Sequence, residues 1–133
     1  MNQLQTLASP IGRLFIAVMF FMAGLSKIFA YQGTLGYMEA MGVPGALLPF
    51  VIATEVVLGL AIIVGFKTRL AAFGLAGFSL VSAVLFHADF SDQMQMTLFM
   101  KNVAIAGGFF FLIAHGGGAY SLDNRLAAQA KAV

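Results

Sequence analysis

The chain has 133 residues, of which 61% are hydrophobic and only 9% are charged, and its formal net charge is +2. Soluble domains contain about 45–50% apolar and about 25% charged residues, and one core of this size could not bury so much apolar surface. The basic residues form no cluster, which excludes a nucleic-acid-binding surface. With a mean hydropathy of +0.96, the sequence predicts an integral membrane protein embedded in a lipid bilayer.

Four apolar stretches are long enough to cross a bilayer, because a membrane helix needs about 20 mostly apolar residues. The first covers residues 10–31, and Pro10 suits the first turn of a helix. The second covers residues 45–66, and the third covers residues 70–87 after a charged turn. The fourth covers residues 97–114 and ends before three glycines, which favour chain reversal. We expect an all-α membrane protein in which residues 1–133 form a single four-transmembrane-helix bundle.

Three polar segments lie outside these spans. Residues 32–44 are rich in glycine, and residues 34–41 within them predict a short surface helix. Residues 88–96 form an acidic loop. Residues 121–133 form a tail that we expect to be a short amphipathic or frayed helix in water.

The distribution of basic residues predicts the orientation of the bundle. One side of the membrane holds both termini and five basic residues, namely Arg13, Lys67, Arg69, Arg125 and Lys131. The opposite side holds two basic and three acidic residues, namely Lys27, Lys101, Glu39, Asp89 and Asp92. Because Lys and Arg are enriched on the cytoplasmic side, we expect both termini to be cytoplasmic.

Several polar side chains fall inside the predicted spans, where an ionisable group costs at least about 2.5–3.5 kcal/mol to insert. Glu55 is the clearest case, because its short side chain lies near the middle of the second span. We expect an inward-facing cluster in the outer half of the bundle as a candidate ligand-binding site, made of Lys27, Glu55, His87, Lys101 and Asn102. Arg13 is a secondary candidate and an alternative partner for Glu55.

The same residues have a simpler interpretation. Lys27, His87 and Lys101 lie close enough to an interface to snorkel, with their stems in lipid and their polar heads in water. A metal site is not expected, since the chain has no cysteine and its two histidines belong to opposite ends of the bundle. His115, before the glycines, is expected to cap carbonyl groups at the end of the fourth helix.

Several short motifs recur together in one known family. They are Gly24-Leu25-Ser26-Lys27, Gly42-Val43-Pro44, Gly65-Phe66-Lys67-Thr68-Arg69, Lys101-Asn102-Val103-Ala104-Ile105-Ala106-Gly107-Gly108 and Gly118-Ala119-Tyr120-Ser121-Leu122-Asp123. With Arg13, Glu55 and His87 between them, the chain resembles the DoxX family of small bacterial membrane proteins over about residues 13–125. The resemblance implies a four-span, multi-pass protein of the bacterial inner membrane.

The resemblance also implies a function. The family name comes from association with a thiosulfate:quinone oxidoreductase, and other members are linked to redox-stress complexes with partner enzymes. This implies a membrane subunit of a redox system that binds a quinone and a partner redox enzyme; any thiol chemistry would reside in that partner. Cationic donors and His87 would hydrogen-bond the quinone carbonyls, and phenylalanine-rich walls would suit the isoprenoid tail.

Two other functions stay open at this point. One is a structural or assembly subunit without catalysis, in which buried charges fix how the helices pack. The other is a small proton-coupled transporter with Glu55 as the gated carboxylate. Because four short helices leave little room for a pathway, the transporter would need a homo-oligomer.

Overall fold

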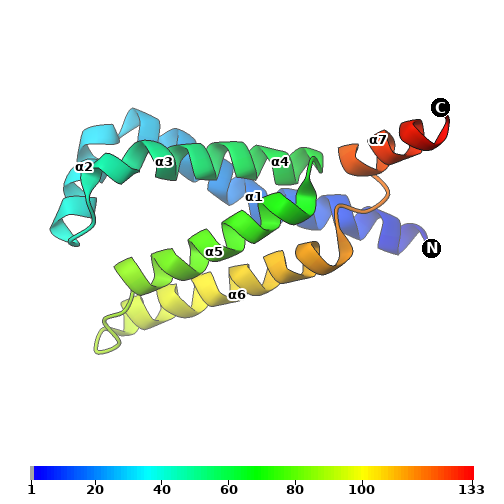
Figure 1. Cartoon of the computed structure of the whole chain (residues 1–133). Coiled ribbons are helices and arrows are strands. Elements are labelled where there is room, and N and C mark those ends of the chain that lie inside the picture. Colours follow the sequence, from blue (N-terminus) through cyan, green and yellow to red (C-terminus); the bar gives the residue numbers. More distant parts are fainter. Residues whose placement is uncertain (1) are drawn as a thin grey trace.

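The computed structural model of the chain describes residues 2–133, and four of their helices are long and apolar enough to span a membrane. These are α1 (Gln3–Phe29), a composite helix from Gly45 to Val64, α5 (Thr68–Phe86) and α6 (Gln93–His115). Both chain ends lie at one end of the bundle, here called the terminal end (Figure 1). The helix α2 (Tyr31–Ala40) and the α5–α6 loop lie at the other, here called the loop end. The predicted four-helix transmembrane fold is confirmed.

The second span is one continuous helix of changing pitch. A 3-10 turn, η1 (Gly45–Leu47), leads into α3 (Leu48–Ala53), a π-turn, η2 (Thr54–Leu58), and then α4 (Gly59–Val64). In a π-turn the backbone hydrogen bonds join residues five apart instead of four, and such turns occur often at functional sites. Glu55 lies in this π-turn.

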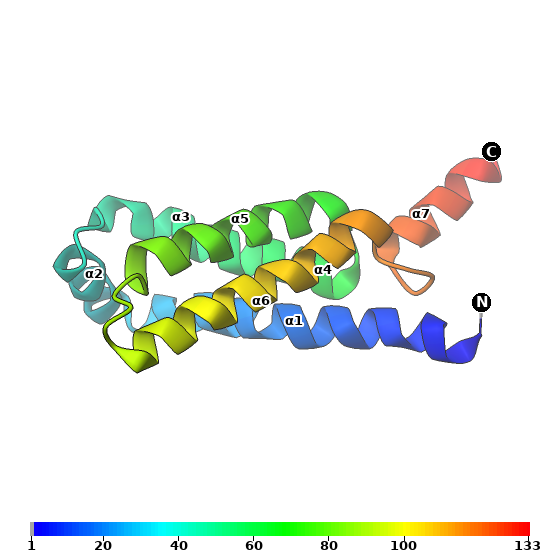
Figure 2. The same cartoon turned by 90° about the horizontal axis from the view of Figure 1, so that it is seen from below.

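The spans pack mainly with their neighbours in the chain. The second span contacts both α1 and α5, and α5 lies along α6. On the remaining side α1 and α6 contact each other through side chains, with the ring centroids of Phe20 and Phe109 5.5 Å apart. Figure 2 shows the same bundle from below. The core contains many small side chains, among them Ala71, Ala72 and Ala76 on α5, which allow helices to approach closely. Large apolar side chains are exposed around the outside of the bundle, where lipid covers them.

The first helix begins earlier than the hydropathy indicated. The side chain of Asn2 accepts a hydrogen bond from the Gln5 N–H at 2.9 Å, and α1 starts at Gln3. Pro10 therefore lies inside the helix, and the prediction that it occupies the first turn is wrong. The cap, rather than the start of the apolar stretch, sets the helix end.

The acidic loop is also shorter than residues 88–96. The Asp92 side chain caps α6 by accepting from the Met94 N–H at 2.9 Å, so α6 begins at Gln93. At the other end α6 stops at His115, before the glycines, as predicted.

The predicted surface helix and the predicted helical tail are both present. In α2 the side chain of Met38 is buried against the loop end of the bundle. The tail forms α7 (Leu122–Lys131), which is capped by Ser121 and extends away from the spans (Figure 1).

Arg13 joins three segments at the terminal end. Its guanidinium is buried, and Nη1 donates to the carbonyl oxygens of Ile62 and Ile63 at 3.0 and 2.9 Å. Nη2 donates to the carbonyl oxygen of Tyr120. Carbonyls in the last turn of a helix lack partners within that helix, so Arg13 satisfies the end of α4. The prediction that Arg13 is an alternative partner of Glu55 is wrong.

Gly65 makes room for this contact. Its φ of +76° is a left-handed conformation that side chains rarely adopt. A Cβ atom built there would lie 2.6 Å from Nη1 of Arg13 and 2.5 Å from Cβ of Ser121. The glycine therefore lets the guanidinium and the C-terminal segment approach the same turn.

Asp123 fastens the start of the tail to the α4–α5 turn. Its carboxylate accepts from the N–H of Lys67 at 2.6 Å and from the N–H and hydroxyl of Thr68 at 2.8 and 2.7 Å. Partial burial would raise the pKa of this carboxyl, but the bonds from Thr68 and Lys67 and the charge of Arg13 outweigh burial and lower the pKa.

The end of α6 is capped differently from the prediction. Nη1 of Arg69 donates to the carbonyl oxygens of Ile113 and Ala114, both at 2.9 Å. The ring of His115 instead stacks on Phe111 at a centroid distance of 6.5 Å. The predicted capping role of His115 is wrong, because a side chain from α5 fills it.

Replacing Arg13 should weaken the terminal end strongly. We expect Arg13→Ala to lower the free energy of unfolding by about 3 kcal/mol, since bonds from charged donors contribute about 1.5–3 kcal/mol each. Thermal unfolding in detergent measures the change. Arg125→Ala, on the exposed face of α7, is the matched control and should change stability by less than about 0.5 kcal/mol. Equal effects of the two variants would contradict the role assigned to Arg13.

The lowered pKa of Asp123 predicts a pH dependence. A depressed carboxyl pKa contributes stability that is complete above the unfolded value, about 3.8, and is lost as the pH falls through the folded value. We expect Asp123→Asn to be less stable than the wild type at neutral pH and the difference to vanish in acid. Melting temperatures of both proteins measured across the acid range test this; a constant difference would contradict it.

Candidate ligand-binding cavity

Lys27 and Glu55 form an ion pair inside the bundle. Nζ of Lys27 lies 3.0 and 2.9 Å from the two carboxylate oxygens of Glu55. Glu55 is 4% exposed, and the Lys27 side chain is about a quarter exposed. Within residues 2–133 this is the one pair of opposite charges in direct contact. Each charge offsets the cost of placing the other in an apolar phase.

Two glycines bring the helices close enough for the pair to form. A Cβ atom on Gly24 would lie 2.6 Å from Cγ2 of Val56 and 3.1 Å from Cβ of Glu55. A Cβ atom on Gly59 would lie 3.1 Å from the backbone nitrogen of Phe21. The backbones of α1 and the second span therefore meet beside Glu55 and again one turn further along, at Gly59.

A cavity of about 550 Å³ lies next to the ion pair. It is lined by residues from α1, α2, the second span, α5 and α6. All five residues predicted for the intramembrane cluster line it, namely Lys27, Glu55, His87, Lys101 and Asn102. Most of its remaining wall is apolar, including Met19, Phe20, Phe50, Phe78 and Leu85. That these residues bind a ligand stays a prediction.

The polar residues around the cavity differ in their contacts. Lys101 is exposed and donates no hydrogen bond to residues 2–133, so of the two lysines in the predicted cluster only Lys27 binds Glu55. Nδ2 of Asn102 donates to the carbonyl oxygen of Ser79 over a long 3.3 Å. Nδ1 of His87 lies 2.9 Å from Oε1 of Gln95. Lys101 and Asn102 thus keep most of their hydrogen-bonding capacity.

The sequence did not predict the hydroxyl groups that line the cavity wall. Ser79 is buried, and its hydroxyl has no hydrogen-bond partner among the described residues. Ser82, Thr34 and Tyr37 also line the cavity. A serine in an apolar helix is usually interpreted as a small packing residue. Only the three-dimensional structure identifies Ser79 as an unsatisfied polar group.

Comparison with known proteins identifies relatives over nearly the whole chain. The family model described as DoxX matches residues 8–88. The chain is 47% identical over 126 residues to the inner membrane protein YqjF of Escherichia coli (strain K12), covering 95% of this chain and 97% of that protein. It is 36% identical over 122 residues to the inner membrane protein YphA of the same organism, covering 86% and 87%. No solved structure matches.

Removing one charge of the Lys27–Glu55 ion pair should strongly lower the free energy of unfolding. We expect Lys27→Met alone and Glu55→Gln alone each to destabilise by about 3–5 kcal/mol when the remaining charge stays buried and ionised. The double variant should lose less than the sum, because it removes both charges together.

Thermal unfolding of the four proteins in detergent, analysed as a double-mutant cycle, measures the coupling. Lys101→Met is the matched control; because Lys101 is exposed and unpaired among residues 2–133, it should change stability by less than about 0.5 kcal/mol. Additive effects of the two single changes would mean that the contact contributes nothing.

Proposed function

The chain belongs to the DoxX family of multi-pass inner-membrane proteins, and from this premise we propose that it is the membrane subunit of a redox system whose cavity binds a quinone head group. The observation that carries the proposal is the cavity itself, which has hydrogen-bond donors on its wall and apolar side chains around them. Its volume of about 550 Å³ falls within the range of about 300–1,000 Å³ that is usual for small-molecule sites.

The donors suit the carbonyl oxygens of a quinone. The ammonium group of Lys101 is unpaired among the described residues, and the amide of Asn102 makes one long hydrogen bond. The buried hydroxyl of Ser79 has no partner in the described chain. A carbonyl oxygen accepts from each of these groups. The aromatic and aliphatic wall offers contact to a quinone ring and to the first part of its tail.

In this proposal the Lys27–Glu55 ion pair supplies charge to the cavity, and His87 supplies proton exchange. A quinone takes up two electrons and two protons when it is reduced; a partner redox enzyme would deliver the electrons. Glu55 accepts or releases a proton only if its contact with Lys27 loosens, since both carboxylate oxygens bind that ammonium group. His87 lines the cavity at the loop end, where the α5–α6 loop meets water. It is our candidate for proton exchange between the cavity and solvent.

We also propose an orientation. Arg13, Lys67, Arg69, Arg125 and Lys131 belong to the terminal end, and the positive-inside rule favours a cytoplasmic location for it. The cavity would then open in the outer half of the membrane.

A structural role is the second candidate, and a specific observation favours it. Both carboxylate oxygens of Glu55 bind the ammonium group of Lys27 without any ligand. Such a pair can fix how α1 and the second span pack, and the protein would then serve assembly with a partner or with further copies of itself.

Quinone binding distinguishes the two functions. Quinone-free protein in lipid nanodiscs is titrated with a short-chain ubiquinone and binding is followed by calorimetry. We expect Lys101→Met and Asn102→Leu each to weaken binding about tenfold, the loss of roughly one hydrogen bond. Lys131→Met, outside the cavity, is the matched control and should bind like the wild type. Failure of the wild type to bind quinone would contradict the redox proposal and favour the structural one.

A further inference from the structure

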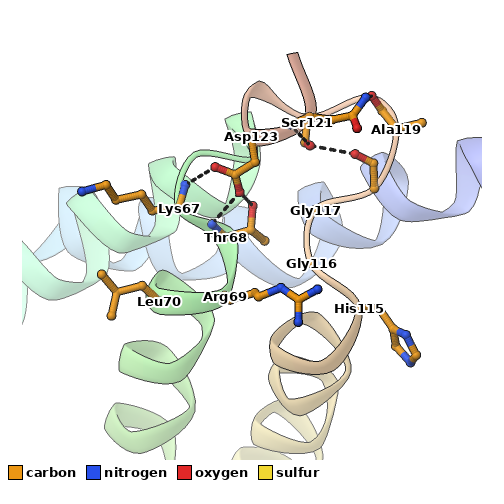
Figure 3. Close-up of a pocket in the computed structure, with 12 residues that line it drawn as sticks. Lys67, Thr68, Arg69, Leu70, His115, Gly116, Gly117, Ala119, Ser121 and Asp123 are labelled. Atoms are coloured by element: carbon orange, nitrogen blue, oxygen red, sulfur yellow. Dashed lines mark hydrogen bonds between the residues drawn. The ribbon is translucent and has the colours of Figure 1, made fainter. Parts of the chain in front are cut away.

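A second cavity, of about 790 Å³, lies at the terminal end and shares no described residue with the first. It is an open pocket bordered by the start of α5, the end of α6 and the glycine loop that leads to α7 (Figure 3). The proposed quinone site makes no use of it, and the two cavities can therefore bind different ligands.

The charge around this cavity is mainly positive. Lys67, Arg69 and His115 line it, and Asp123 is the one acidic residue among the described residues of its wall. Both carboxylate oxygens of Asp123 already accept hydrogen bonds, from Lys67 and Thr68. The acid is therefore engaged within the fold, while the basic side chains keep unused donors.

The guanidinium of Arg69 is held in place by one of its three nitrogens. Nη1 donates to the last carbonyl groups of α6, whereas Nε and Nη2 donate no hydrogen bond within residues 2–133. Nε and Nη2 form one edge of the planar group, the edge that binds two oxygens of a phosphate side by side. Arg69 is thus anchored with a two-donor edge unoccupied.

The neighbouring glycines leave this edge uncovered. A Cβ atom on Gly116 would lie 3.4 Å from Nε and 3.5 Å from Nη2 of Arg69, so a side chain there would stand against it. The backbone N–H groups of Gly117 and Gly118, which also line the cavity, donate no hydrogen bond within the described chain. Guanidinium and backbone donors are therefore available in one place.

Two further side chains with N–H donors lie near the same place. In Figure 3 the side chains of Lys67 and His115 extend away from Arg69 on opposite sides of it. Both residues are exposed, and Lys67 has a flexible four-carbon stem, so either can turn toward an anion.

The cavity also lies at the depth where lipid phosphates occur. The third span begins at Thr68 and the fourth ends at His115, so this level marks the edge of the apolar layer. Leu70, in the same wall, is 67% exposed and offers an acyl chain contact just inside that edge. Basic pockets between spans at this level are suited to anionic headgroups.

We infer that this cavity binds the phosphate of an anionic phospholipid headgroup, with the Nε–Nη2 edge of Arg69 as its main contact and Lys67 and His115 as supporting hydrogen-bond donors. A free phosphate compound has the same chemistry, and the experiment separates these two sources.

The test measures lipid preference by native mass spectrometry of the full chain from mild detergent, after exchange into mixed phosphatidylglycerol and phosphatidylethanolamine. We expect the wild type to retain phosphatidylglycerol about tenfold over phosphatidylethanolamine, because Lys67 and Arg69 repel the ammonium group that accompanies the phosphate of phosphatidylethanolamine. Arg69→Gln removes the two-donor edge together with its charge, and it should abolish most of this preference.

Because Arg69 also caps α6, a second variant that leaves this cap intact distinguishes lost lipid binding from misfolding. Lys67→Gln/His115→Gln removes two side chains that make no hydrogen bond in the described chain, and it should lower the preference several-fold. Arg125→Gln is the matched control on α7, outside the cavity, and should keep it. No preference in the wild type, or an unchanged preference in both variants, overturns the lipid assignment.

Inorganic phosphate distinguishes the source. Added to lipid-free protein at millimolar concentration, it should leave the melting temperature unchanged if the site needs a lipid headgroup. Stabilisation by phosphate that is lost in Lys67→Gln/His115→Gln, without lipid preference in the wild type, would overturn the lipid assignment in favour of a soluble phosphate compound.

Discussion

The contact between Lys27 and Glu55 determines how the first half of the bundle is built. A carboxylate at mid-membrane depth needs an opposite charge, and among the described residues only α1 supplies one in direct contact. Gly24 lets the backbones approach for that contact, and the π-turn at Thr54–Leu58 contains Glu55 itself. The pair also forms part of the polar wall of the cavity.

The two ends of the bundle differ in how they are held. At the terminal end, side chains form hydrogen bonds with backbone groups of distant segments. Arg13 donates to carbonyl oxygens of α4 and of the C-terminal segment, and Asp123 accepts from an N–H group at the start of α5. At the loop end, contacts are mostly apolar, with Met38 buried and Tyr37 stacked on Phe86. The hydrogen bonds that join distant segments through side chains are thus concentrated at the end of the bundle opposite the cavity that contains the ion pair.

Much of the architecture could be predicted from the sequence, because apolar length decides which segments cross a bilayer. The depth of Glu55 and its need for a cation followed on energetic grounds. Which cation it meets depends on the rotation and approach of two helices, which hydropathy does not report, so Arg13 was misassigned. The cap that Arg69 provides joins residues more than forty positions apart, beyond any local pattern. The π-turn and the unsatisfied hydroxyl of Ser79 likewise depend on how neighbouring helices pack.

The contact between Arg13 and Tyr120 has a consequence for biogenesis. The two residues are 107 positions apart, so a ribosome has made all four spans before the second acceptor segment exists. Until then the guanidinium can bind only the carbonyls of α4, which enter the membrane earlier. The contact of Arg13 with Tyr120 can therefore form only after the fourth span has been synthesised.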